Sequence, residues 1–267
     1  MSEPATPDEI LERTQWDFFW IPPDAVAVDR PELACLSCPR DVGMLNTVTR
    51  TRAAPERLPA LVAEVGERHR AVTSRWLVPA TFDTRPLERI LDDGGWRPAH
   101  EHFAFTLPVE SSSPRPASGV RVEPVRDLRT LRDCIEVAER AFGDARQPTD
   151  AQLAQELAAV TRPGARVHRF VAYDRDGRPV GSGGMSLFPA LSFGLLFAGA
   201  TIPGARGRGF YSAVLAARIE TARALGFARV GLYARRESSA PIVARQGFER
   251  HGPMTYWDRP ARAPGPR

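Results

Sequence analysis

The stretch "GARGRGFYSAV", residues 204–214, places three glycines and two arginines directly before a segment with helical spacing of apolar residues. Glycine disfavours a helix by about 1 kcal/mol relative to alanine, so helix formation does not explain this composition. The N-terminus of a helix carries unpaired N–H groups and a partial positive charge. Small residues let phosphate oxygens approach those groups, and Arg206 and Arg208 would add charge-assisted donors. The stretch therefore predicts a diphosphate-binding site.

Two other nucleotide-binding patterns fit this stretch less well. A Rossmann fingerprint needs G-x-G-x-x-G and an acidic residue about 20 positions further on. The run Gly207, Gly209 and Tyr211 breaks that pattern, and Glu237 comes late. A phosphate loop of the Gly-Lys-Ser/Thr type is excluded, because all 36 basic residues are arginine. A glycine-rich loop that binds nothing stays open as the structural alternative.

The segments around this loop must hold it in place. An apolar strand over 191–202 precedes it, and we expect the long helix after it to stop at Gly226. That helix should bury residues at helical spacing, namely Tyr211, Val214, Leu215, Ile219, Ala222 and Leu225. Further strands are predicted over 119–125, 166–174, 178–188, 228–234 and 249–257, and shorter helices over 127–142, 149–160 and 238–247. Asp127 and either Thr149 or Asp150 are expected to cap two of the helices.

The first part of the chain repeats this order in a shorter form. Strands are predicted over 32–38, 44–52, 74–81 and 102–109, and helices over 55–70 and 85–95. Both parts end in a strand, a short helix, glycine before an aromatic residue, and a strand, in "LERILDDGGW" and "APIVARQGF". Only the second part contains the glycine-rich loop. Trp76 and Trp96 are expected in the core of the first part.

The segment "PVESSSPRPASG", residues 108–119, has the composition of a linker, because Ser, Pro and Gly dominate it. The sequence therefore predicts two domains, 1–112 and 120–258, joined by a linker over 113–119. The last residues, 259–267, are rich in Pro and Arg and are expected to form a disordered tail.

Composition narrows the class of protein. The chain has 267 residues, 43% apolar and 25% charged, which are globular proportions. The net charge is only +4 and the arginines are spread among 32 acidic residues, so nucleic-acid binding is not expected. Cys35 and Cys38 lack the second ligand pair of a zinc site and are expected to be small buried residues, with no metal bound. Three cysteines and no signal peptide predict a reduced cytoplasmic protein, and no long apolar run predicts that it has no membrane span. We also expect a monomer or a homodimer.

Residues 119–258 resemble the GNAT superfamily of acyl-CoA-dependent N-acetyltransferases. The run from Arg206 to Gly209 matches the family's Arg/Gln-x-x-Gly-x-Gly/Ala pyrophosphate loop through its fourth position, whereas Tyr211 stands at the sixth. Gln246-Gly247-Phe248 resembles the Gly-Phe that closes the family's last helix. The resemblance implies an α+β fold, with a mixed and mostly antiparallel sheet flanked by helices. Residues 1–112 resemble the C-terminal half of the same fold more weakly, so we expect two tandem GNAT-like domains, the first degenerate.

The resemblance also implies acetyl-CoA as the cosubstrate and names the residues that would bind it. The segment "ATIP" matches the end of the strand that pairs with pantetheine, and Ser239 stands where many members carry an asparagine that contacts the coenzyme. The implied coenzyme-binding residues are Ala200, Thr201, Ile202, Arg206, Gly207, Arg208, Gly209, Phe210, Tyr211 and Ser239.

The implied reaction is attack of a primary amine, on a small molecule or a peptide, on the thioester of acetyl-CoA. Many members place an acidic tyrosine four residues before the Gly of Gly-Phe, but Val243 occupies that position here, and the fourth strand carries no carboxylate. The nearest polar candidates are Tyr233, Glu237 and Ser239, with Ser238, and the loop over 141–150 offers Asp144 and Asp150. Because two usual catalytic side chains are missing, a catalytically silent acyl-CoA-binding or interaction module stays open as the alternative.

Overall fold

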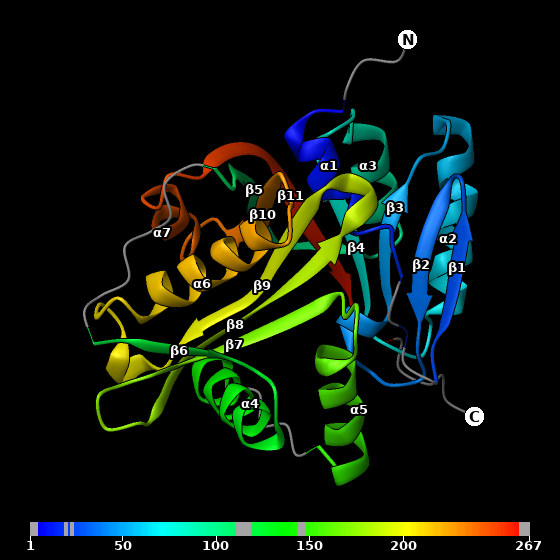
Figure 1. The fold of residues 1–267 in the computed structure, drawn as a ribbon. Coiled ribbons are helices and arrows are strands. Elements are labelled where there is room, and N and C mark those ends of the chain that lie inside the picture. Colours follow the sequence, from blue (N-terminus) through cyan, green and yellow to red (C-terminus); the bar gives the residue numbers. More distant parts are fainter. Residues whose placement is uncertain (1–4, 19–20, 22–23, 111–118, 144–147, 262–267) are drawn as a thin grey trace. The chain divides into compact units, whose positions relative to one another are not determined.

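The computed structural model describes residues 5–18, 21, 24–110, 119–143 and 148–261, and Figure 1 draws its helices and strands. Most of the predicted linker, Asp144 and most of the predicted tail lie outside these residues. The chain divides into two compact units, each described by itself. Unit 1 contains 1–104, 233–241 and 250–267, and unit 2 contains 105–232 and 242–249.

Unit 1 is a sheet with helices. Its strands are β1 (Val26–Arg30), β2 (Leu33–Ser37), β3 (Thr47–Thr51), β4 (Ser74–Pro79) and most of β11 (Glu249–Arg259). Its helices are α1 (Pro7–Arg13), α2 (Leu58–Arg68) and α3 (Arg85–Asp93), with 3-10 turns at Gly43–Leu45 and Pro55–Arg57. The first three strands pair antiparallel, whereas α2 carries the chain across to β4, which runs parallel to β3. The sequence predicted these elements except α1 and β1.

Unit 2 repeats the order at larger size. Its strands are β6 (Arg121–Pro124), β7 (Val167–Tyr173), β8 (Pro179–Phe188), β9 (Phe193–Thr201) and the first part of β10 (Arg229–Arg235). Its helices are α4 (Leu128–Phe142), α5 (Asp150–Thr161), α6 (Phe210–Ala224) and part of α7 (Ala240–Ala244), with 3-10 turns at Pro189–Leu191 and Pro203–Ala205. Neighbours from β6 to β9 pair antiparallel, and α6 leads to β10, which runs parallel to β9. Figure 1 shows α4 and α6 on opposite faces of these strands.

The last strand of each half of the sequence, β5 (Arg97–Pro108) and β11, enters the compact unit that the other half mostly forms. β11, the last strand, pairs antiparallel with β4, with Met254 opposite Pro79. β5 passes into unit 2 from Phe105 on, and just beyond it the N–H of Val109 donates to the carbonyl of Ala228. The compact units therefore differ from the sequential division at 112 and 120 that the sequence predicted. Strand periodicity shows which face is buried, but it does not show which edge a strand will join.

Each unit has its own apolar core. In unit 1, Trp76 and Trp96 meet edge to face at 5.7 Å between ring centres, among residues of β2, β3, α2 and α3. In unit 2, Phe210 and Val214 of α6 pack on one cluster, and Leu131 of α4 packs in another. The tryptophans are thus core residues, as predicted.

The helix ends follow local capping rules. The side chain of Asp127 accepts the N–H of Thr130 at 2.8 Å, and that of Thr149 accepts the N–H of Gln152 at 3.3 Å. Both caps were predicted, and Asp150 is instead the first residue of α5. The predicted buried face of α6 is wrong at one end, because Leu225 is 50% exposed. Four residues outside that predicted set are buried on α6, namely Phe210, Ala213, Ala216 and Arg218.

Candidate functional site

The loop between β9 and α6 ends in a helix N-terminus that no side chain caps. After the turn Pro203–Ala205, Gly207 and Gly209 adopt positive φ angles of 74° and 83°. Residues with a Cβ avoid this conformation, which explains glycine at both positions. Gly209 is the N-cap of α6, and it offers no side-chain oxygen to the first N–H groups of the helix. These donors therefore point to an anionic ligand as their partner.

The arginines of the loop are exposed on both sides of Gly207. The Nε of Arg206 lies 3.4 Å from the carbonyl oxygen of Thr201, and the guanidinium of Arg208 lies 5.3 Å from the ring centre of Phe210. In the part of the chain that the structure describes, neither arginine forms an ion pair with a carboxylate. Two unpaired cations beside an uncapped helix favour a diphosphate.

The end of β9 contains a bulge. The register with β8 shifts between the pairs Gly184–Phe197 and Ser182–Ala200, so that Ala198 and Gly199 share one partner position. Ala198 has a φ of 48°, a conformation that is uncommon for a residue with a side chain. A bulge of this kind turns backbone groups out of the ladder. Sequence reasoning did not foresee it, because the strained residue is alanine.

The parallel pairing between β9 and β10 ends early. Its last paired residues are Leu195 and Gly231, so among the described residues no strand pairs with the β10-facing edge of β9 from Leu196 to Thr201. Ala200 and Ile202 are buried, and the Oγ1 of Thr201 is buried without a hydrogen-bond partner among the described residues. An open strand edge and an orphaned hydroxyl next to the loop would fit an extended chain of amide groups, such as pantetheine.

The predicted coenzyme-binding residues from Ala200 to Tyr211 thus lie on one continuous strand end, loop and first helical turn of unit 2. Tyr211 is half-buried, and its ring packs over Gly199 of the bulge, since a Cβ added there would lie 3.0 Å from its Cε2. The three predicted catalytic residues, Tyr233, Glu237 and Ser239, belong to the segment 233–241 of unit 1.

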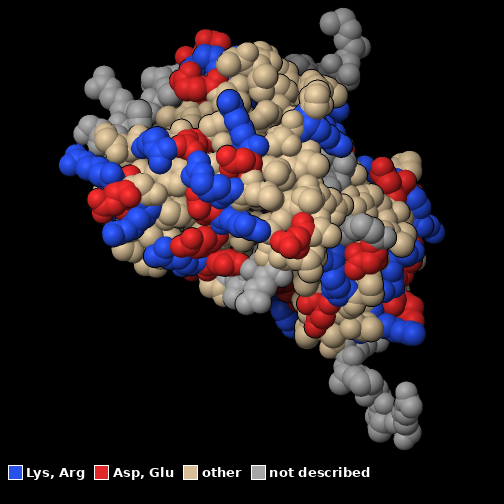
Figure 2. All heavy atoms as spheres, turned by 60° about the horizontal axis from the view of Figure 1, so that its bottom comes forward, with Lys and Arg blue, Asp and Glu red and all other residues tan. Residues whose placement is uncertain are grey.

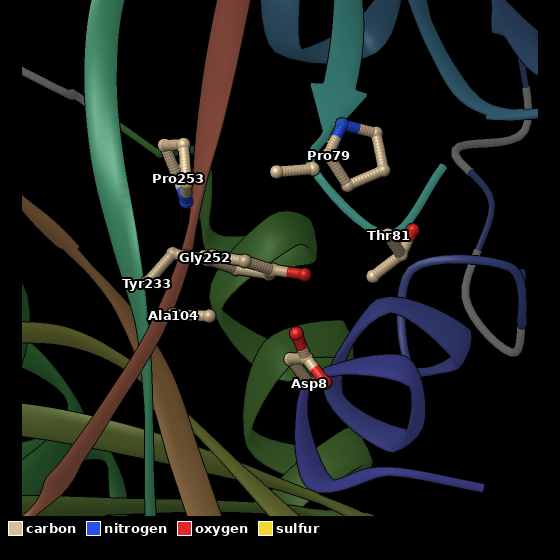
Figure 3. Close-up of a pocket in the computed structure, with 8 residues that line it drawn as sticks. Asp8, Pro79, Thr81, Ala104, Tyr233, Gly252 and Pro253 are labelled. Carbon is tan, nitrogen blue, oxygen red and sulfur yellow. The ribbon is translucent and has the colours of Figure 1, made fainter. Parts of the chain in front are cut away.

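Within unit 1, Tyr233 faces a small pocket. Figure 3 shows its hydroxyl and the carboxylate of Asp8 pointing into the same space, beside Thr81. The pocket measures about 10 Å³, which is room for one water-sized group. Burial, and the negative charges of Glu12 and Asp8, raise the pKa of Tyr233 well above its usual value. Tyr233 therefore stays protonated near neutral pH and is able to donate a hydrogen bond.

The other polar candidates lie in plainer surroundings. Glu237 is exposed in the turn after β10, and Ser239 is half-buried just before α7. Asp150 is exposed on α5, 3.6 Å from Arg132 in an ion pair. Val243, at the helix position where the resemblance would place an acidic tyrosine, is fully buried and carries no ionisable group.

Charges and metal ligands point to no other kind of site. On the face in Figure 2, Arg side chains alternate with Asp and Glu, without a patch of one sign. Several exposed arginines form ion pairs, among them Arg129 with Glu123 and Arg140 with Glu136. Within the described ranges, no cluster of His, Cys, Asp and Glu is arranged to hold a metal ion, and Cys35, Cys38 and Cys134 are free and buried. No helix among the described residues is long and apolar enough to cross a bilayer.

Comparison with known proteins shows what this chain is similar to. A profile of the acetyltransferase (GNAT) family matches residues 131–248. A GCN5-related N-acetyltransferase from Kribbella flavida is 15% identical with a TM-score of 0.65, covering 89% of this chain and 90% of that one. A second one, from Sphaerobacter thermophilus, is 17% identical with a TM-score of 0.62, covering 96% and 87%. A tandem GNAT protein from the clavulanic acid biosynthesis pathway is 14% identical with a TM-score of 0.63, covering 99% and 91%. No curated protein matches the sequence.

Proposed function

We propose that the protein is a GNAT-type acetyltransferase, as the match of residues 131–248 to the acetyltransferase (GNAT) family model supports, and that it transfers an acetyl group from acetyl-CoA to a primary amine of a small molecule or peptide. The observation that carries the proposal is the uncapped N-terminus of α6, flanked by Arg206 and Arg208 and preceded by the bulged strand β9. These residues fit the two parts of coenzyme A that differ most in chemistry. The loop suits the diphosphate, and the open edge of β9 suits pantetheine.

In this proposal the loop binds the coenzyme through backbone groups. The first N–H groups of α6 receive the diphosphate oxygens, and Arg206 and Arg208 neutralise their charge. The edge of β9 from Leu196 to Thr201 pairs with the amides of pantetheine, and Thr201 Oγ1 gains a partner. Ser239 remains a proposed coenzyme contact.

The coenzyme, when bound, supplies a thioester carbonyl. The amine nitrogen bonds to the carbonyl carbon, and the electron pair moves to the oxygen, where N–H groups of the bulge would stabilise it. The electron pair on the oxygen would then re-form the carbonyl, the C–S bonding pair would leave with the thiolate, and the proton lost by the amine would pass to water or to a carboxylate such as Glu237. A thiol with a pKa of roughly 8.5 needs little help from an acid. Tyr233 stays the candidate donor that the sequence suggested.

A second candidate function follows from two missing groups. Val243 stands where a general acid would be expected from the family resemblance, and β9 carries no carboxylate. A silent acyl-CoA-binding module would retain the loop and lose turnover.

The test has two stages. A rise in melting temperature with acetyl-CoA, but not with adenosine, would support the coenzyme site. Thiol release from acetyl-CoA in the presence of a polyamine, an amino sugar, an aminoglycoside or a peptide would then support transfer. Binding without any thiol release would favour the silent module, and absence of both would refute the proposed function.

A further inference from the structure

Helix α6 buries a cation that no carboxylate neutralises. Arg218 is 2% exposed. Its Nη1 donates to the carbonyl oxygens of Gly184 at 3.2 Å and Phe197 at 3.4 Å, and its Nε donates to that of Val214 at 3.3 Å. The side chain of Tyr211 also hydrogen-bonds to it. Among the described residues no acidic side chain forms an ion pair with Arg218, and burial lowers its pKa.

The sheet leaves space for this guanidinium. A Cβ added at Gly183 would lie 3.1 Å from its Cζ, and one added at Gly199 would lie 3.4 Å from its Nη2. Real side-chain contacts are rarely that close, so a residue larger than glycine would displace the arginine. Glycine at 183 and 199 therefore fits the presence of Arg218. A smaller apolar residue at position 218 would not require glycine on these two strands.

The guanidinium lies at the bulge of β9. Gly184 and Phe197, whose carbonyls it binds, are opposite each other in the ladder between β8 and β9. The register shifts immediately after this pair, and the next residue, Ala198, has the strained φ of 48°. Arg218 therefore holds both strands at the point where the bulge begins.

A buried charge without an opposite charge is costly, because little in the interior replaces its hydration. Groups of this kind concentrate at functional sites, where a ligand or a reaction supplies the missing charge. The proposed reaction places an oxyanion beside the bulged backbone. A cation behind that backbone would favour it.

Building on the proposed function, we propose that Arg218 is a positioning residue of acyl transfer, which fixes the bulged backbone at Ala198–Ala200 and supplies positive charge behind the acyl oxygen. It touches neither substrate in this account. It acts through the carbonyl of Phe197 and through the N–H groups that follow it. Its removal should therefore lower kcat more than the affinity for the coenzyme.

The experiment compares Arg218→Met and Arg218→Lys with the wild type and with Arg178→Met. Arg178 lies in an exposed turn with its side chain 75% exposed, so the control loses the same charge at a remote place. For each protein we would measure the melting temperature, the Kd for coenzyme A, and kcat and KM with acetyl-CoA and the best amine from the panel above. We expect kcat to fall at least thirtyfold in Arg218→Met, with the Kd changed less than threefold. Arg218→Lys should recover part of kcat, and Arg178→Met should match the wild type.

The outcomes separate this inference from the proposed function. A wild type without turnover refutes the proposed function and this inference with it. An active wild type with equal kcat in folded Arg218→Met, or with a kcat loss matched by the loss in Kd, overturns the inference alone. If Arg218→Met does not fold, Gly183→Ala replaces it, since it displaces the guanidinium while keeping its charge. That variant should lower kcat several-fold at unchanged Kd, and an unchanged kcat would overturn the inference.

Discussion

The two units share an order of elements and differ where a parallel pair of strands separates. In unit 2 the pairing of β9 with β10 ends at Leu195 and Gly231, and a glycine loop opens beyond it. In unit 1 the pairing of β3 with β4 ends at Val48 and Trp76, and protein side chains fill the place beyond it.

In unit 1, the gap beyond the paired part of β3 and β4 is filled by side chains that make specific contacts. The indole of Trp76 donates to Thr51 Oγ1 at 2.9 Å, so it closes the gap between the two strands. Arg52, directly after β3, donates to the carboxylate of Glu12 at 2.6 Å, and Glu12 is 3% exposed on α1. The guanidinium of Arg52 also lies 4.6 Å from the ring centre of Phe82.

The connections to the following helices differ in the same sense. The segment "RAAPER", residues 52–57, contains no glycine, and Pro59 lies in the first turn of α2, where it offers no N–H. Its counterpart before α6 has two glycines at positive φ and free donors. If unit 2 binds the coenzyme as proposed, the strand–helix–strand scaffold is not sufficient for binding. The proposal requires that the strand gap and the helix N-terminus stay open.

The largest expected effect is the loss of coenzyme affinity when the loop before α6 is altered. Gly209→Glu places a carboxylate at the N-terminus of α6 and strains a residue with a φ of 83°, so we expect coenzyme affinity to fall more than a hundredfold. Gly177→Glu is the matched control, because Gly177 has a φ of 76° in a turn with no atom near its Cβ position. Titration calorimetry with coenzyme A measures both. Equal losses in the two variants would show that the loop is not the site.

Acid should weaken unit 1. Burial lowers the pKa of His69 and of His102 to about 4, and Arg259 and Arg235, respectively, add to the shift. Because the unfolded chain binds these protons near pH 6.5, the stabilisation is complete above that pH and is lost as pH falls towards 4. The loss is at most roughly 3 kcal/mol per histidine. All five tryptophans lie in the parts of the sequence that form unit 1, so urea unfolding followed by tryptophan fluorescence at pH 7.5 and 5 measures it. Stability independent of pH in this range would contradict the burial of both rings as neutral groups.

A smaller effect concerns the filled gap of unit 1. Glu12→Gln removes the charge opposite Arg52, and we expect the free energy of unfolding to fall by about 2 kcal/mol, since a mostly buried pair loses one partner. Coenzyme affinity should stay within twofold, because Glu12 lies outside the proposed coenzyme site. Glu67→Gln, in an exposed pair with Arg70, should change stability by less than about 0.5 kcal/mol. A second coenzyme site in Glu12→Gln would mean that the filling alone separates the two units.

The smallest expected effect is catalytic. Tyr233→Phe should lower kcat less than about tenfold, whereas a true general acid contributes 10²–10⁴-fold. Because burial keeps the pKa of Tyr233 well above 10, kcat/KM should rise with pH and show no decline until well above pH 9. A bell-shaped profile that loses its basic limb in Tyr233→Phe would identify Tyr233 as the acid.

Local signals predicted much of this structure. The glycines and arginines at 204–209 marked the loop, and the capping residues Asp127 and Thr149 marked two helices, because backbone chemistry acts over a few residues. The pairing of β11 with β4 of unit 1 was not predictable, since an amphipathic strand fits more than one sheet edge. Ala198 gave no sign of its positive φ. Nothing in the sequence indicated that Arg218 is buried, because its burial depends on glycines of β8 and β9 that are distant in sequence.

The central claim is that the chain binds the coenzyme once, at the open loop of unit 2. Titration calorimetry of the intact chain with acetyl-CoA tests it most directly, with Gly209→Glu titrated in parallel. We expect one equivalent bound per wild-type chain and no measurable binding to the variant. Two equivalents per chain, or unchanged binding to Gly209→Glu, would contradict the account.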